Sequence, residues 1–465
     1  MSPRISVIVL LFIAVRIVTA TCYSDTYYYY GMISNQFAIA EAAYHGHWFS
    51  EDKALSENVC RVARDGQRFV PVEKYGEYGN SGVYTTFPAQ DLPGYGYLIA
   101  ETSKLFSTHL TSRYAYITQV VTELLSLLLF VFCIERTFGQ RTSLIAALLY
   151  ILCCPFLWPI ASLPMRDIFV LGIFACFFAA WYLFKERNDV AGYAGIVLLI
   201  GTASLLLWVR PSGYYYFFLV SPLGLFITNR TWVQRIAFVL IAVFLPLFIF
   251  NLQFKRFNKH YYGTENTDLV GRALWEGMGI VPDNKYGFKL DDAALVSWVK
   301  SQGYEVKYSS PEMNRVLGQY ARKVIREDPG YYARTVLVRT KQILAGPIDV
   351  VLPNKTLSIK ESGLSLKEFV RAHPYDFVQK ILSKIYVFLF FYGSLFLLGL
   401  AFFKEREKRL DLLLLTSPFF YTLATQIPLH FEPRYLATGA WVLVLPIAWG
   451  INRIIEKREQ KLCAA

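Results

Sequence analysis

Cysteine and charge are both scarce in this sequence. The 465 residues include 7 cysteines, with no Cys-x-x-Cys pair and no spacing typical of metal ligands, so a zinc-binding module is not expected. Charged residues account for 18% of the chain, whereas hydrophobic residues account for 54%. The charges lie between long apolar runs, which argues against a soluble chain and indicates a membrane protein.

The balance of the charges is basic, because 47 lysines and arginines exceed 35 aspartates and glutamates and give a net charge of +12. Such a balance would suggest a nucleic-acid partner if the basic residues formed one block. They are instead distributed among the turns between apolar runs, as membrane topology requires. We therefore expect a lipid bilayer as a partner and no nucleic acid.

Six of the seven cysteines fall into two groups. Four of them lie inside apolar runs, where inert packing is expected. Cys22 and Cys60 would both lie on the outer side of the membrane, and they are either free or joined by a disulfide.

Apolar runs near the length of about 20 residues that a bilayer demands recur along the whole chain. The first is read as an uncleaved span, because Thr21-Cys22 is a poor cleavage or lipidation site. The sequence thus predicts an all-α polytopic membrane protein of about ten spans. The runs are 5–20, 112–134, 142–159, 167–184, 190–208, 213–228, 234–253, 376–402, 410–427 and 435–453.

Three regions are expected from the spacing of these runs. Residues 1–254 form an N-terminal membrane module, whose first outer loop, 21–111, contains surface helices near 31–48 and 96–106. Residues 255–375 form a helical cap with an amphipathic helix at 310–327, and residues 376–465 form the C-terminal spans.

The basic turns set the orientation of the spans. With the N-terminus in the cytoplasm, every short cytoplasmic turn is rich in lysine and arginine, as the positive-inside rule requires. Both termini are then cytoplasmic. The basic residues of these turns are Arg136, Arg141, Lys185, Arg187, Arg230, Arg235, those from Lys404 to Arg409, and those from Arg453 to Lys461.

The outer turns carry ionisable residues at the membrane edge. Charges at this depth are costly and usually face a cavity or a partner. Arginine pairs bidentately with phosphate and a carboxylate acts as a general base, so one site for an anionic lipid head group is indicated. The residues concerned are Asp25, Arg166, Asp167, Arg210, Glu432, Arg434 and Tyr435.

Simpler interpretations of some residues stay open. Asp25 follows the first run and either caps the next helix or acts as the general base. Arg16, inside that run, either snorkels to the interface or turns towards a lipid phosphate. Tyr28 and its neighbours at 27–30 either form an aromatic belt or stack on a sugar or lipid.

Six short motifs occur in order along the chain, and together they resemble the C-type glycosyltransferase (GT-C) superfold. This superfold includes the protein O-mannosyltransferases of family 39 and the lipid A aminoarabinose transferases. The motifs are Asp25 with the tyrosines behind it, the proline-glycine segment 88–97, Arg166-Asp167, Leu207-Trp208-Val209-Arg210-Pro211, Arg326-Glu327-Asp328-Pro329-Gly330-Tyr331-Tyr332, and Glu432-Pro433-Arg434-Tyr435.

The resemblance implies transfer of a sugar from a polyprenyl-phosphate carrier to a glycan, lipid or protein on the outer side. Asp25 would be the base of an inverting reaction, and Asp167 would align an arginine or, with Asp25, hold a divalent metal such as Mg, Mn or Zn. The leaving phosphate would be bound by Arg210 and Arg434, with Arg166 and Arg16 behind them. Glu432, Tyr435 and Tyr28 would support them. Separately from the resemblance, the short loops and the lack of eukaryotic retention signals indicate a bacterial inner membrane.

The sequence departs from the superfold where Asp25 is followed by Thr26, because a second acid often stands there. Two other functions stay open. A polysaccharide polymerase or ligase would carry outer arginines without the Asp of the first span. A lipid-linked sugar flippase would favour charges inside the spans and an internal repeat, but Arg16 and Glu123 are the main charges there and the halves do not match.

Overall fold

The computed structural model describes most of the chain, and the structural statements below concern those residues. The predictions for Asp25, Tyr28, most of the surface helix at 31–48 and Cys60, the candidate partner of Cys22, lie outside them. The described ranges are 3–22, 94–106, 113–162, 166–262, 270–282, 284–290, 292–305, 310–347 and 362–464, with residues 40, 43–44, 46 and 265.

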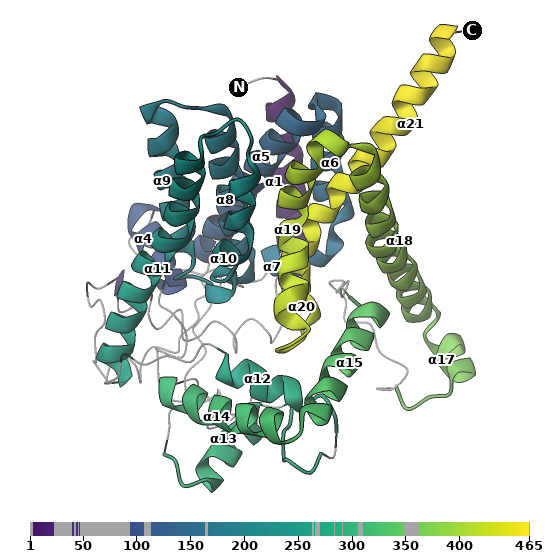
Figure 1. Cartoon of the computed structure of the whole chain (residues 1–465). Helices are drawn as coiled ribbons and strands as arrows, with labels where there is room; N and C mark the ends of the chain where they lie inside the picture. The colour runs from purple at the N-terminus through teal and green to yellow at the C-terminus, as the bar shows by residue number, and fades with distance from the viewer. Residues whose placement is uncertain are drawn as a thin grey trace.

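Across these ranges the chain is helical and has no strand, which confirms the expected all-α class. The long helices stand side by side in a bundle, with both termini at one end (Figure 1). Six segments are long and apolar enough to cross a membrane. The bundle contains α1 (Pro3–Cys22), α5 (Arg113–Phe138), α6 (Gln140–Cys153), α8 (Phe169–Glu186), α9 (Val190–Leu206), α11 (Trp232–Tyr262), α18 (Pro374–Lys404), α19 (Arg409–Gln426), α20 (Pro433–Ala440) and α21 (Val444–Ala464).

Helix α8 lies at the centre of this bundle. It is apolar on all sides, as expected of a helix that is surrounded by others. In the segment Arg166–Glu186, 94% of the residues in the apolar stretch are buried. The Phe174 ring lies 4.6 Å from Tyr216 and 6.0 Å from Tyr421, which brings α8 against α10 (Tyr216–Val220) and α19. Residues at the start of α8 are therefore held by a rigid, packed element.

The predicted span 213–228 is not one continuous helix. It consists of α10 between two 3-10 helices, η5 (Pro211–Gly213) and η6 (Ser221–Phe226). The segment still runs the length of α8, because Arg210 pairs with Asp167 at one end and Arg230 Nε donates to the Phe184 carbonyl at the other, at 2.6 Å. A 3-10 helix rises about 2.0 Å per residue against 1.5 Å for an α-helix, so fewer residues cover the distance.

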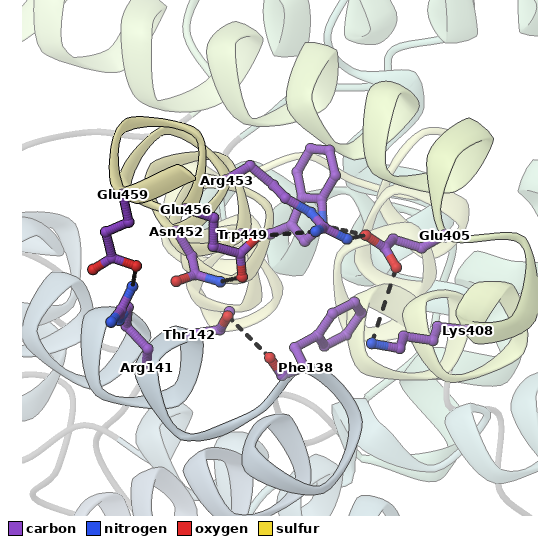
Figure 2. Close-up of polar contacts among 10 residues, drawn as sticks. All are labelled: Phe138, Arg141, Thr142, Glu405, Lys408, Trp449, Asn452, Arg453, Glu456 and Glu459. Carbon is purple, nitrogen blue, oxygen red and sulfur yellow. Dashed lines mark hydrogen bonds and ion pairs between the residues drawn. The ribbon is translucent and has the colours of Figure 1, made fainter. Parts of the chain in front are cut away.

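The basic turns meet at the end of the bundle that carries the termini, which we call the basic end. Figure 2 shows part of this end, where Arg141 lies 2.9 Å from Glu459 and Glu405 accepts hydrogen bonds from Arg453 and Trp449. Contacts between Arg136 and Glu186, Arg230 and Phe184, and Lys185 and Asp411 bring in the remaining turns.

A smaller group of helices lies at the other end of the bundle (Figure 1). Its core includes Trp275, Met278, Leu295 and Leu317. The amphipathic helix predicted at 310–327 is confirmed, with the Ser310 hydroxyl capping it by accepting from the Met313 amide at 3.2 Å. The helices are α12 (Gly271–Met278), α13 (Asp292–Ser301), α14 (Pro311–Glu327), α15 (Pro329–Ala345) and, further along the chain, α17 (Leu366–Ala372).

Candidate active site

Asp167 and Arg210 form an ion pair at the end of α8 that faces away from the basic end. Asp167 lies in the short 3-10 helix η4 (Arg166–Ile168), which leads into α8, and Arg210 directly precedes η5. Oδ1 of Asp167 lies 2.8 Å from Nη2 of Arg210, and the two side chains are 8% and 15% exposed. Pro211 restricts the backbone after Arg210, so this arginine is held at the start of a turn.

A second ion pair lies on the turn between α19 and α20. Oε2 of Glu432 is 2.5 Å from Nε of Arg434, and Oε1 of Glu432 is 3.0 Å from Nε2 of His430. Burial acts to raise the pKa of Glu432. The hydrogen bond from His430 and the charges of Arg434 and Arg210 outweigh it and hold this pKa below its usual value.

Tyr435 joins the two ion pairs. The guanidinium carbons of Arg210 and Arg434 lie 5.0 and 4.9 Å from the centre of its ring, within the range of cation–π attraction. Arg434 Nη2 also donates to the Tyr435 hydroxyl at 3.1 Å. Two arginines and two carboxylates that are far apart in sequence thus form one cluster, which we call the arginine pair site: Asp167, Arg210, His430, Glu432, Arg434 and Tyr435.

The arginine pair site keeps donor capacity for a further anion. A guanidinium has five N–H donors, and Asp167 occupies only some of those of Arg210. Nε of Arg210 is buried and makes no hydrogen bond to the described part of the chain. Phosphate oxygens bind guanidinium groups bidentately, so the chemistry of the site suits a phosphate.

Arg166 lies beside the arginine pair site in η4, half-buried and close enough to Tyr95 of α4 (Gly94–Phe106) for its charge to act on that phenol. The Tyr95 hydroxyl donates to Oε1 of Gln119 at 2.5 Å, and Gln119 donates to the Ile160 carbonyl at 3.2 Å. These contacts hold α4 against α5 and α7 (Trp158–Ser162). Tyr95 lies in the motif 88–97, although its role was not predicted, and the sequence offered no signal for Gln119 because it does not lie in a charged turn.

Arg16 lies away from the cluster, inside the bundle. It is 3% exposed, and its Nε donates to Oε2 of Glu123 at 2.7 Å, while the Tyr150 hydroxyl donates to Oε1 of the same carboxylate at 2.7 Å. The side chain is therefore buried between α1, α5 and α6 rather than turned to the membrane surface. Its role towards a lipid phosphate stays a prediction.

The described residues do not fit a divalent metal. No group of three or more His, Cys, Asp or Glu side chains within the described ranges is placed to hold one. Asp167 has a guanidinium as its neighbour, which repels a cation. His430 was missed as a site residue, although it stands two positions before Glu432 in a turn already singled out.

No family model matches the sequence, and no curated protein matches it. Among solved structures, the chain is similar to ArnT from Cupriavidus metallidurans bound to undecaprenyl phosphate, with 13% identity and a TM-score of 0.34 over 95% of this chain and 77% of that one. It is also similar to an Archaeoglobus fulgidus oligosaccharyltransferase tethered to an acceptor peptide, with 12% identity and a TM-score of 0.45 over 96% of this chain and 50% of that one.

Both matches are membrane glycosyltransferases of the GT-C type, the class that the sequence motifs resemble. The chain spans only half the length of the oligosaccharyltransferase. At these TM-scores the likeness carries no argument about activity, so a function has to rest on the residues of this chain.

Proposed function

We propose that this chain is an integral membrane glycosyltransferase that transfers a sugar from a polyprenyl-phosphate carrier to an acceptor on the extracytoplasmic side. The observation that carries the proposal is the arginine pair site, in which Arg210 and Arg434 flank one tyrosine at the end opposite the basic turns. The positive-inside rule assigns the basic end to the cytoplasm, so the site faces outward. The membrane would be a bacterial inner membrane, with both termini cytoplasmic.

The main catalytic requirement of this reaction is stabilisation of the leaving phosphate. The acceptor hydroxyl oxygen attacks the anomeric carbon and forms the new glycosidic bond. The bond from that carbon to the phosphate oxygen breaks, and its electron pair stays on the phosphate, whose charge Arg210 and Arg434 balance. The hydroxyl proton passes to Asp25, and attack from the face opposite the phosphate inverts the anomeric centre.

The two carboxylates orient the cations before the donor arrives. Asp167 fixes Arg210 and Glu432 fixes Arg434, so neither guanidinium has to be ordered during the reaction. Tyr435 keeps both arginines near one point. A glycan, a lipid or a protein would serve as acceptor.

The proposal is tested by donor discharge in membranes. Radiolabelled polyprenyl-phosphate sugars are supplied to wild type, Asp25→Asn and, as a matched control, Glu407→Gln, a carboxylate exposed at the basic end. Wild type and Glu407→Gln should release label from one donor, and Asp25→Asn should be slower by about 10²- to 10⁴-fold because the general base is lost.

Two outcomes would contradict this mechanism. If Asp25→Asn discharges the donor as fast as wild type, Asp25 is a helix cap. If wild type discharges no donor in the panel, the glycosyltransferase proposal fails and the polymerase, ligase and flippase functions take its place.

A further inference from the structure

Arg339 of α15 is a fully buried arginine whose hydrogen-bond partners are all uncharged. Its side chain is 0% exposed. Nε donates to the Ile427 carbonyl at 2.7 Å, Nη2 donates to the Pro428 carbonyl at 3.0 Å and to the Thr335 hydroxyl at 3.2 Å, and Nη1 donates to the Gly277 carbonyl. One side chain therefore ties α15 to α12 and to the turn that follows α19.

The same turn is held by two further contacts. The Tyr332 hydroxyl of α15 donates to the Pro428 carbonyl at 2.9 Å. A Cβ atom on Gly277 would lie 1.5 Å from the Leu429 carbonyl oxygen, so α12 and the turn meet backbone to backbone. Only glycine permits this approach.

The turn leads directly into the arginine pair site. His430, Glu432 and Arg434 all follow Leu429 within five residues. The placement of their side chains depends on where the turn begins, and Arg339 fixes that beginning.

Burying a cation among neutral groups is a costly way to gain stability. Burial lowers the pKa of Arg339 to about 10, although the neighbouring Tyr332 and Tyr331 act in the opposite direction. An apolar side chain would fill the same volume without this cost. An apolar side chain cannot form hydrogen bonds to carbonyls. The planar guanidinium of Arg339 binds three of them, one from α12 and two from the turn.

We propose that Arg339 is a positioning residue of the arginine pair site, which aligns His430, Glu432 and Arg434 by anchoring the turn at Ile427 and Pro428 to α12 and α15. This inference rests on the proposed function for its catalytic consequence. Its structural consequence is independent of that function.

The test compares Arg339→Lys with Arg334→Lys, a matched change at an exposed arginine on the same helix. Lysine keeps the charge, but its three donors are on one nitrogen and not on a planar fork, so it cannot meet the three carbonyls in the positions that Arg339 reaches. Kinetics of donor discharge and amide hydrogen exchange are measured on full-length protein, at a temperature where all forms are folded. We expect Arg339→Lys to lower kcat by about 10- to 100-fold, as a displacement of about 1 Å can, with the KM for the donor changed less than twofold.

Hydrogen exchange separates a positioning role of Arg339 from a loss of folded structure in the helices α12–α15. In Arg339→Lys, amides at 429–436 should exchange at least tenfold faster, while those of α13 and α14 keep their wild-type protection. Equal loss of protection across α12–α15 would mean that Arg339 only stabilises these four helices, and it would overturn the inference. Wild-type kcat in Arg339→Lys, in an active preparation, would overturn it as well.

Failure of the proposed function gives a different result. If wild type discharges no donor, the exchange comparison alone decides whether Arg339 positions the turn. Unchanged exchange at 429–436 in Arg339→Lys would then reject the positioning role.

Discussion

At the scale of the residue, the arginine pair site balances its own charges. Two guanidinium groups near one ring repel each other, and Arg210 and Arg434 avoid that cost because each has its own carboxylate. The charge of Asp167 also acts on Arg434, so the four ionised groups form a single network. A network of this kind is preorganised for an incoming anion.

Replacing Arg434 with lysine tests the need for a guanidinium. Lysine keeps the positive charge but loses the planar fork that binds a phosphate and the contact with Tyr435. We expect Arg434→Lys to reduce kcat for donor discharge by about 10²-fold, in line with the loss of one preorganised charge contact.

Arg406→Lys, at an exposed arginine of the basic end, serves as the control and should keep wild-type activity. An Arg434→Lys protein that folds normally and works at the wild-type rate would rule out a guanidinium-specific role.

The arginine pair site is predictable from the sequence because its members stand at the ends of apolar runs. Span ends on the same side of a membrane lie near one another, so the positions of Asp167, Arg210 and Glu432 along the chain are enough to group them. Arg339 could not be found this way, because its partners are backbone carbonyls, which every residue has. Arg16 and Glu123 stand out in the sequence as charges inside the spans, but the sequence did not predict that they pair.

At the scale of the element, α19 and α20 frame the turn that carries Glu432. They pack closely at Gly439, where a Cβ atom would lie 2.3 Å from the Thr422 hydroxyl oxygen and 2.5 Å from the Pro418 carbonyl oxygen. Thr422 itself donates to the Pro418 carbonyl at 3.0 Å. The approach of the two helices therefore depends on the absence of a side chain at position 439.

Adding one methyl group at this contact should separate the helices. We expect Gly439→Ala to destabilise the folded protein by about 1–3 kcal/mol, the usual cost of overpacking, and to lower the midpoint of thermal unfolding in detergent. Gly393→Ala in α18 is the matched control, because its Cβ would meet nothing within 4 Å and alanine favours a helix. Equal midpoints for the two variants would contradict the close contact at Gly439.

The positions of the helices were more predictable than whether each span is one continuous helix. Apolar runs located the long helices, because length and hydropathy are local properties of the sequence. The division of 213–228 into η5, α10 and η6 was not predicted. Pro222 stands at the start of η6, but an apolar run containing proline also occurs inside α11, where Pro246 lies within a continuous helix. Packing against neighbours, which the sequence does not display, decides between these forms.

At the scale of the whole molecule, the two ends of the bundle differ in chemistry. The basic end carries the arginines and lysines of four short turns and of the end of α21, and the opposite end carries the arginine pair site and the helices α12–α15. This polarity is the basis of our proposal that the site faces outward.

Cysteine labelling tests the assignment directly. Cys463 is exposed near the C-terminus, at the basic end. We expect a membrane-impermeant maleimide to label Cys463 in inside-out vesicles but not in intact cells, and to label a Gln302→Cys protein in intact cells because that position is exposed between α13 and α14. Each result is scored against a Cys463→Ser background. Labelling of Cys463 in intact cells would reverse the topology and place the site on the cytoplasmic face.

The ion pair between Arg16 and Glu123 has a consequence for how the chain is made. Translation proceeds from the N-terminus at about 5–20 residues per second, and the two partners are 107 residues apart. For about 5–20 s after Arg16 is synthesised, the first helix therefore carries a charge whose partner does not yet exist, at a cost of about 2.5–3.5 kcal/mol if it sits in lipid. The first helix is thus expected to be held more firmly in the membrane once the helix that carries Glu123 has emerged from the ribosome and the two charges can pair.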